Sequence, residues 1–145
     1  MAGPALAEQA ARLAEELELL RRLSYKSHNQ HRRAAYYRAL KMAQRRMRVV
    51  AGFDWAPWSE AIRLVESAKS WEQLLVCSIG QALVDLAGLA RLARRAHHCC
   101  LVAAKRLSSL VAQGFFLPFG VVSLGLVSRL ASHAKFFCNR AAVRA

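Results

Sequence analysis

A dense run of hydrogen-bonding side chains occupies residues 28–33 of this sequence. It consists of His28, Asn29, Gln30, His31, Arg32 and Arg33. Asn and Gln amides can read base edges, histidine can stack or bind phosphate, and arginine can do both. Asn29 could instead cap a helix, and His31 could be an ordinary surface or core histidine. The run indicates a nucleic-acid contact, with these two structural roles left open.

A row of basic residues follows, on the helix that we expect from about Ser27–Gln30 to Val50. Projected at about 100° per residue, this helix has an apolar stripe and, on the opposite side, a basic stripe. The apolar stripe is Tyr36, Leu40, Ala43, Met47 and Val50; the basic stripe is Arg38, Lys41, Arg45 and Arg48, and Arg46 is a further candidate contact. A merely solvated face usually mixes charges of both signs. Because residues 21–50 contain no acid, the pattern favours phosphate binding.

Tyr36 and Tyr37 are adjacent, so their side chains point about 100° apart on a helix. Tyr36 belongs to the apolar stripe and is expected in the core. Tyr37 is expected at the boundary of that stripe, where its ring can pack against the bundle or stack on a base. We count Tyr37 among the candidate RNA contacts and keep packing as the alternative.

The overall charge supports a polyanionic partner. The chain has 145 residues, 22 Lys or Arg and 9 Asp or Glu, with a formal net charge of +13. The bases are concentrated in residues 21–50 and 91–145, and neither segment contains an acid. Such segregated positive charge is typical of proteins that bind nucleic acid or an anionic membrane surface. It argues against an enzyme that depends on several carboxylates.

A second, weaker RNA surface is expected further along the chain. Its candidate residues are Arg94, Arg95, Lys105 and Arg106. The neighbouring run from His97 to Cys100 suggests zinc, but four consecutive residues on a helix diverge too far to close on one ion, which leaves a site that His97 and Cys100 share with His133 or Cys138 as the weaker alternative. No Gly-rich phosphate loop or Gly-x-Ser-x-Gly elbow occurs either. We therefore predict no metal, no cofactor and no catalytic residue, and we expect the four cysteines to be reduced thiols.

Helical periodicity runs through almost the whole chain, and no segment alternates long enough for a strand. We expect helices over about 5–23, 27–50, 59–69, 71–95 with a continuation as far as 113, and 118–137. The 55% of hydrophobic residues excludes disorder throughout. The prediction is an all-α, compact helical bundle of five to six helices, forming a single domain over residues 1–145.

Residues 107–128 contain no charge and are long enough to cross a bilayer. Gly114, Pro118 and several serines interrupt the stretch, which favours a buried core helix over a membrane span. The N-terminal residues show no signal-peptide pattern. Two alternatives stay open: a small membrane protein with one span near 107–128, and a basic helical module that binds an acidic protein.

Two segments resemble the RNA-binding domain of the RNase MRP-specific protein subunit family. The first is Ser24–Arg33 with its Asn-Gln-His-Arg core, followed by an aromatic pair, Leu40 and a basic cluster at Arg45-Arg46. The second runs from Leu110 through Gln113-Gly114-Phe115-Phe116 into a small-residue apolar helix that ends near Arg129. The aromatic pair is Tyr-Tyr here, where the family more often has Trp.

This resemblance implies a non-catalytic subunit of a nucleolar ribonucleoprotein that processes ribosomal RNA precursors. Its partners would be RNase MRP RNA and other protein subunits of that particle, with no membrane and no small-molecule substrate. The resemblance also implies that the uncharged late segment is a buried helix.

Overall fold

The computed structural model describes residues 3–54 and 79–142, and all regular structure in these residues is helical. The elements are α1 (Gly3–Lys26), the single-turn α2 (His28–His31), α3 (Ala35–Ala51), α6 (Ile79–Ala112) and α7 (Leu117–Ala142). The predicted all-α class is confirmed for the described residues. Gly52 follows α3 as its C-cap, at the position where the sequence predicts the helix to end.

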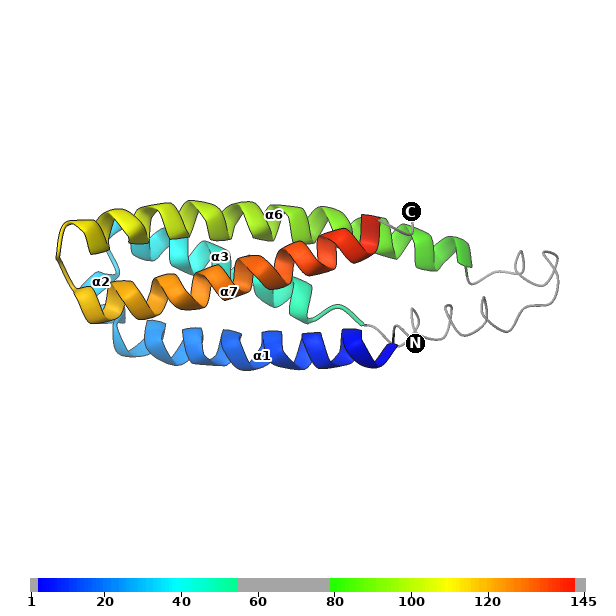
Figure 1. Cartoon of the computed structure of the whole chain (residues 1–145), viewed down its shortest axis with the longest axis horizontal. Coiled ribbons are helices and arrows are strands. Elements are labelled where there is room, and N and C mark those ends of the chain that lie inside the picture. Colours follow the sequence, from blue (N-terminus) through cyan, green and yellow to red (C-terminus); the bar gives the residue numbers. More distant parts are fainter. Residues whose placement is uncertain (1–2, 55–78, 143–145) are drawn as a thin grey trace.

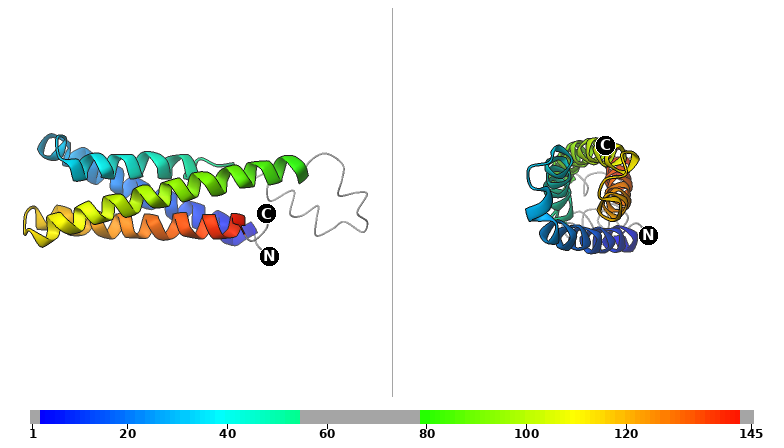
Figure 2. Two further views of the ribbon diagram at one scale, coloured as in Figure 1. Left: turned by 90° about the horizontal axis from the view of Figure 1, so that it is seen from above. Right: turned by 90° about the vertical axis from the view of Figure 1, so that its left-hand side faces the viewer.

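Four long helices pack as an elongated bundle (Figure 1). Each long helix packs mainly against two neighbours, α1 against α3 and α7, and α6 against α3 and α7, and an end view shows this arrangement (Figure 2); α3 and α7 make a smaller contact across the bundle. The turn from α1 through α2 to α3 lies at the same end as the hairpin between α6 and α7. We call this the hairpin end. Here two distant parts of the sequence, residues 27–34 and 113–116, are neighbours.

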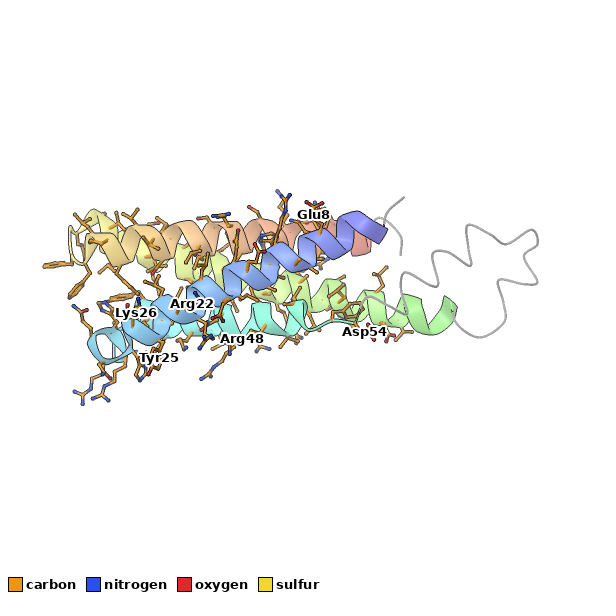
Figure 3. The ribbon with its side chains drawn as sticks, turned by 90° about the horizontal axis from the view of Figure 1, so that it is seen from below. Glu8, Arg22, Tyr25, Lys26, Arg48 and Asp54 are labelled. Atoms are coloured by element: carbon orange, nitrogen blue, oxygen red, sulfur yellow. The ribbon has the colours of Figure 1, made fainter. Side chains whose placement is uncertain are left out.

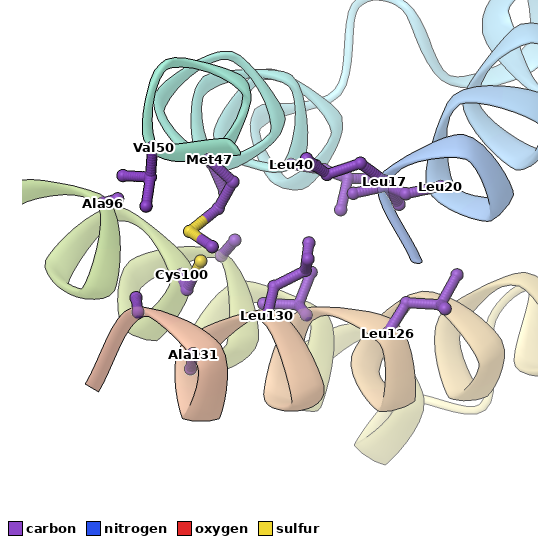
Figure 4. Packing of buried hydrophobic residues seen from close by; sticks show 14 of the residues in the cluster. Leu17, Leu20, Leu40, Met47, Val50, Ala96, Cys100, Leu126, Leu130 and Ala131 are labelled. Carbon is purple, nitrogen blue, oxygen red and sulfur yellow. The ribbon is translucent and has the colours of Figure 1, made fainter. Parts of the chain in front are cut away.

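One hydrophobic core runs along the bundle axis (Figure 4). Leu13, Leu17 and Leu20 of α1 face Leu40 and Met47 of α3, and all five are at most 6% exposed. The facing surfaces of α6 and α7 use small residues instead, including Ala93, Ala96, Ala103, Ala131 and Ala134. Small side chains let these two helices approach closely, which explains why their contact is the most extensive in the bundle.

The structure corrects three details of the predicted elements. The described residues contain four packed helices, so the predicted count of five to six is not matched. The helix expected over 27–50 is interrupted after His31, because Ala34 adopts an extended backbone with ψ 142° before α3 begins. Ser27 precedes α2, but its side chain makes no capping hydrogen bond. The helix expected over 59–69 lies outside the described residues.

The uncharged segment 107–128 is not one helix. α6 continues past Arg95 to Ala112, and the chain then reverses through Gly114 and Phe116, whose φ angles are 74° and 50°. This turn contradicts a single membrane span over 107–128. One helix among the described residues, α7 over Leu117–Asn139, is long and apolar enough to span a membrane, with mean hydropathy 1.2. That is weak evidence, since the core helix of a soluble protein passes the same test.

Charge is separated along the length of the bundle. The acids of α1, from Glu8 to Glu18, lie before its last two turns, and Asp54 follows α3 at the end away from the hairpin (Figure 3). Asp85 lies near the start of α6, and no acid follows it in the sequence. The described acids therefore lie away from the hairpin end, whereas the last turns of α1, all of α2 and the first turns of α3 carry only positive charges.

Candidate nucleic-acid interface

A groove of about 510 Å³ lies where the C-terminal turns of α1, the start of α2 and the first turns of α3 meet. Its lining includes two lysines, an arginine, a tyrosine, a histidine and an asparagine, and no acid. They are Arg21, Tyr25, Lys26, His28, Asn29 and Lys41, with the buried Ser24 and Tyr37 beneath them. Four of the predicted site residues, His28, Asn29, Tyr37 and Lys41, are thus brought together here.

Tyr37 forms the floor of this groove rather than an exposed platform. Its ring is 2% exposed, and its hydroxyl donates to the backbone oxygen of Ser24 over 2.6 Å. Tyr36 is the more accessible of the pair, so the predicted core and boundary roles are exchanged. The physical reason is the position of α1, which packs on the side of α3 that carries Tyr37. The hydrogen bond from Tyr37 holds the end of α1 against α3, and the buried ring has no face on which a base could stack.

His31 is also buried, at 2% exposed, which corrects its prediction as an RNA contact and leaves it a core histidine. Its Nδ1 lies 2.7 Å from the hydroxyl of Tyr36, and its ring packs against Phe116 and Phe119 with centroids 4.7 and 4.4 Å away. Burial lowers the pKa of His31. The histidine therefore ties α2 to the α6–α7 hairpin in its neutral form.

The remaining residues of the 28–33 run point into solvent. Gln30, Arg32 and Arg33 are exposed, as are His28 and Asn29 at the groove. The His28 ring lies beside Tyr37, with Nδ1 3.4 Å from the tyrosine hydroxyl. The run thus splits into one buried anchor and five accessible side chains.

The basic row on α3 is accessible along the flank that faces α1 and along the outer surface. Arg38, Arg45 and Arg48 are exposed, and Lys41 is half-buried at the groove. Burial, together with the charges of Arg48 and Arg45, lowers the pKa of Lys41. Its Nζ donates to the buried Gln44 over 3.1 Å. These cations repel one another, so a bound phosphate would relieve the repulsion.

Arg46 lies on the other flank of α3, facing α6. Arg106 donates to the backbone oxygen of Ala35 at the start of α3 over 3.2 Å. The helices α3 and α6 are antiparallel. Arg46 lies eleven residues after Ala35 on α3, and Arg95 lies eleven residues before Arg106 on α6, so the two arginines lie at the same height along the bundle axis. Arg46, Arg95 and Arg106 therefore follow the seam between α3 and α6. Arg94 and Lys105 are exposed about 100° around α6 from Arg95 and Arg106, which divides the predicted second surface in two.

Three groove residues, Arg21, Tyr25 and Lys26, are not among the contacts predicted from the sequence. All three are exposed, and Tyr25 is 81% exposed. Arg21 makes two hydrogen bonds of 2.6 and 2.7 Å to Glu18, and these, with Arg22, lower the pKa of Glu18 to about 2. The sequence signal for these three residues is the stretch without acids, which begins at residue 19 and not at the predicted helix start near Ser27.

Within the His97–Cys100 run, His97 and Cys100 contribute to the packing of α6, whereas His98 is exposed. His97 Nδ1 donates to the backbone oxygen of Ala131 on α7 over 3.1 Å, and Cys100 is fully buried. Burial raises the pKa of the Cys100 thiol to about 12, so the thiolate that binds metal is disfavoured. Among the described residues, no group of three or more His, Cys, Asp or Glu side chains could hold a metal ion.

A second groove, between α1 and α7, holds a polar cluster that joins these helices. Buried Glu16 accepts from Arg129 over 2.7 Å and lies 3.7 Å from His133 Nε2. Gln9 lies 2.9 Å from His133 Nδ1, which places the histidine proton on Nε2, toward Glu16. The buried acid is thus compensated by charge from the opposite helix, and the cluster is a structural clamp.

No family model matches this chain, and neither curated proteins nor solved structures give a match.

Proposed function

We propose that this chain is a non-catalytic RNA-binding subunit of the RNase MRP type, which holds the particle's RNA and supports processing of ribosomal RNA precursors. Its partners are RNase MRP RNA and other protein subunits, and its location is the nucleolus. The family assignment rests on the two sequence segments described above. The RNA-binding assignment rests on the surface chemistry of the hairpin end.

One observation carries the RNA-binding proposal. The last turns of α1, the exposed part of α2 and the exposed row of α3 form a single positive surface, and no acid lies among residues 19–53. Lys and Arg side chains at helical spacing bind phosphates and release counterions, which supplies most of the affinity of such interfaces. The groove adds Asn29 and His28 as groups that can recognise a base or sugar locally.

Charge reversal of three residues tests this interface. The variant Arg38→Glu/Lys41→Glu/Arg45→Glu is expected to lose RNA binding and to keep its helical circular dichroism. A matched control is Arg12→Glu/Arg91→Glu/Lys135→Glu, which changes the net charge equally at exposed sites on the other helices. Retained binding in the first variant, or equal loss in the control, would refute the assignment to this surface.

The family assignment needs a separate experiment. The tagged protein is purified from cells in moderate salt, and the RNA that accompanies it is sequenced. One abundant RNA of the RNase MRP class is the expected result. A broad mixture of RNAs that washes off in moderate salt would contradict the family assignment and leave a basic bundle without a specific RNA.

Exposed apolar side chains at the hairpin between α6 and α7 favour a second candidate function, that of a protein-interaction module. Phe115, Phe116, Leu117, Val121 and Val122 are each 45–63% exposed and adjoin one another at the hairpin end. Exposed apolar groups of this kind often mark protein contacts. If protein binding is the main function, Phe115→Ser/Val121→Ser abolishes recovery of partner subunits, and nuclease treatment leaves that recovery unchanged.

A further inference from the structure

The most exposed large hydrophobic side chain of the described residues, Tyr25, lies at the rim of the basic groove. Tyr25 is 81% exposed, and its ring packs against no other aromatic ring of the described residues. A tyrosine ring has roughly 150–250 Å² to bury, and the folded bundle leaves most of it in water. The fold therefore gains little from this side chain, which is available to a ligand.

Tyr25 is held in place although it is exposed. The preceding residue, Ser24, is buried, and its backbone oxygen accepts the 2.6 Å hydrogen bond from Tyr37. One turn earlier, Arg21 is oriented by its two hydrogen bonds to Glu18. The end of α1 is thus fixed against α3, and the ring projects from a rigid backbone. Because the backbone is fixed, only the two side-chain torsions of the tyrosine have to be ordered when a second flat group stacks on its ring.

Cations stand on both sides of the ring. Lys26 follows it on α1, Arg21 precedes it by one turn, and Lys41 faces it across the groove from α3. Asn29 supplies a carbonyl oxygen and an amide nitrogen at the same groove, and both can bond a base edge. The volume of about 510 Å³ falls in the range of roughly 300–1,000 Å³ that small-molecule sites occupy.

We infer that this groove is a nucleotide site, in which one unpaired base of the RNA stacks on Tyr25 and its neighbouring phosphates bind Lys26, Arg21 and Lys41. A base inside an A-form helix has both faces covered by its neighbours, so only an unpaired nucleotide offers a face to the ring. The inference rests on the proposed RNA-binding function and names the class of RNA: a structured RNA with a bulged or looped nucleotide.

Two RNA hairpins test the inference with the full chain. They share one sequence, but one carries a single bulged nucleotide, in which the base is 2-aminopurine. Stacking of one base on an aromatic side chain is expected to make the bulged RNA bind about 5- to 100-fold more tightly. Fluorescence anisotropy measures the affinities, and quenching of 2-aminopurine reports stacking directly.

Three variants separate stacking from other effects. Tyr25→Ala is expected to bind both hairpins equally and to leave 2-aminopurine bright, whereas Tyr25→Phe keeps the preference and the quenching. The control His98→Ala, which removes an exposed aromatic ring on α6, keeps both as well. Because Tyr25 is exposed, its replacement leaves the helical circular dichroism unchanged.

Each other outcome has a defined meaning. If the native chain binds both hairpins equally, or if Tyr25→Ala keeps the preference, the nucleotide site is refuted while RNA binding stands. If the native chain binds neither these hairpins nor cellular RNA, the proposed function itself fails.

Discussion

His31 connects the two turns at the hairpin end, and its protonation state sets the strength of that connection. The ring is packed among Phe116, Phe119 and Tyr36, where a charge is poorly solvated. Because burial lowers its pKa in the fold, the unfolded chain takes up a proton near the usual value of about 6.5 while the folded chain does not. Stability is therefore fully present above that pH and falls as the pH decreases below it.

We accordingly predict that the midpoint of thermal unfolding decreases between about pH 6.5 and pH 5. The variant His31→Phe keeps an aromatic ring in the cluster and is expected to flatten this dependence. The variant His98→Ala removes an exposed histidine and should leave the dependence as it is. Thermal unfolding followed by circular dichroism over this pH range gives the comparison, and an unchanged profile in His31→Phe would assign the effect to another group.

At the scale of elements, the close approach of α6 and α7 depends on Gly120. A Cβ built at this position would lie 2.8 Å from Cγ2 of Val111, a branched side chain with little freedom to move. The first turn of α7 can therefore pack on the last turn of α6 only if residue 120 has no side chain. Glycine destabilises a helix interior, but at this position the contact between α6 and α7 requires a residue without a side chain.

Gly120→Ala is predicted to destabilise the bundle by about 1–3 kcal/mol through overpacking. Gly125, one and a half turns later, has open space around a built Cβ. Gly125→Ala should therefore stabilise α7 by about 0.5–1 kcal/mol, as alanine does in exposed helix positions. Urea unfolding of the two variants measures both signs. Equal effects from the two substitutions would show that the α6–α7 contact does not depend on residue 120.

The elements were predictable from the sequence where one periodic pattern decided them. The end of α3 at Ala51 and the course of α7 follow from hydrophobic spacing and the glycine after α3. The break at residues 32–34 was not predictable, since no Gly or Pro marks it, and it depends on His31 turning into the aromatic cluster. For the candidate site, the spacing predicted that the bases of α3 lie on an accessible face, whereas the polyanion binding that the residue types indicate stays a prediction.

Which side chains face outward depended on where α1 lies. Spacing alone placed Tyr36 in the core and Tyr37 at its edge, because both lie near the apolar stripe. The hydrogen bond from Tyr37 to Ser24, thirteen residues away, decides between them. Tyr25 lies at the groove because the end of α1 packs beside α3, a placement that residue spacing does not predict.

At the scale of the whole molecule, affinity for RNA should depend steeply on salt. If the row Arg38, Lys41, Arg45 and Arg48 makes about four phosphate contacts, the logarithm of the association constant falls with a slope of about −3 to −4 against log salt. Arg45→Ala is expected to reduce this slope by roughly 0.7–0.9, and Lys135→Ala on α7 should not change it. A slope near zero would contradict a phosphate interface.

The separation of charge along the bundle also sets how the molecule meets its ligand. A long body with acids toward one end and only bases at the other behaves as an electric dipole, and the field of a polyanion turns it during approach. The turn that contains α2 then contacts the proposed RNA first, and a smaller share of encounters occurs in orientations that cannot bind. In the proposed RNA complex, the acids of α1 weaken the positive field away from the hairpin end, so the RNA is attracted most strongly to the face that is proposed to bind it.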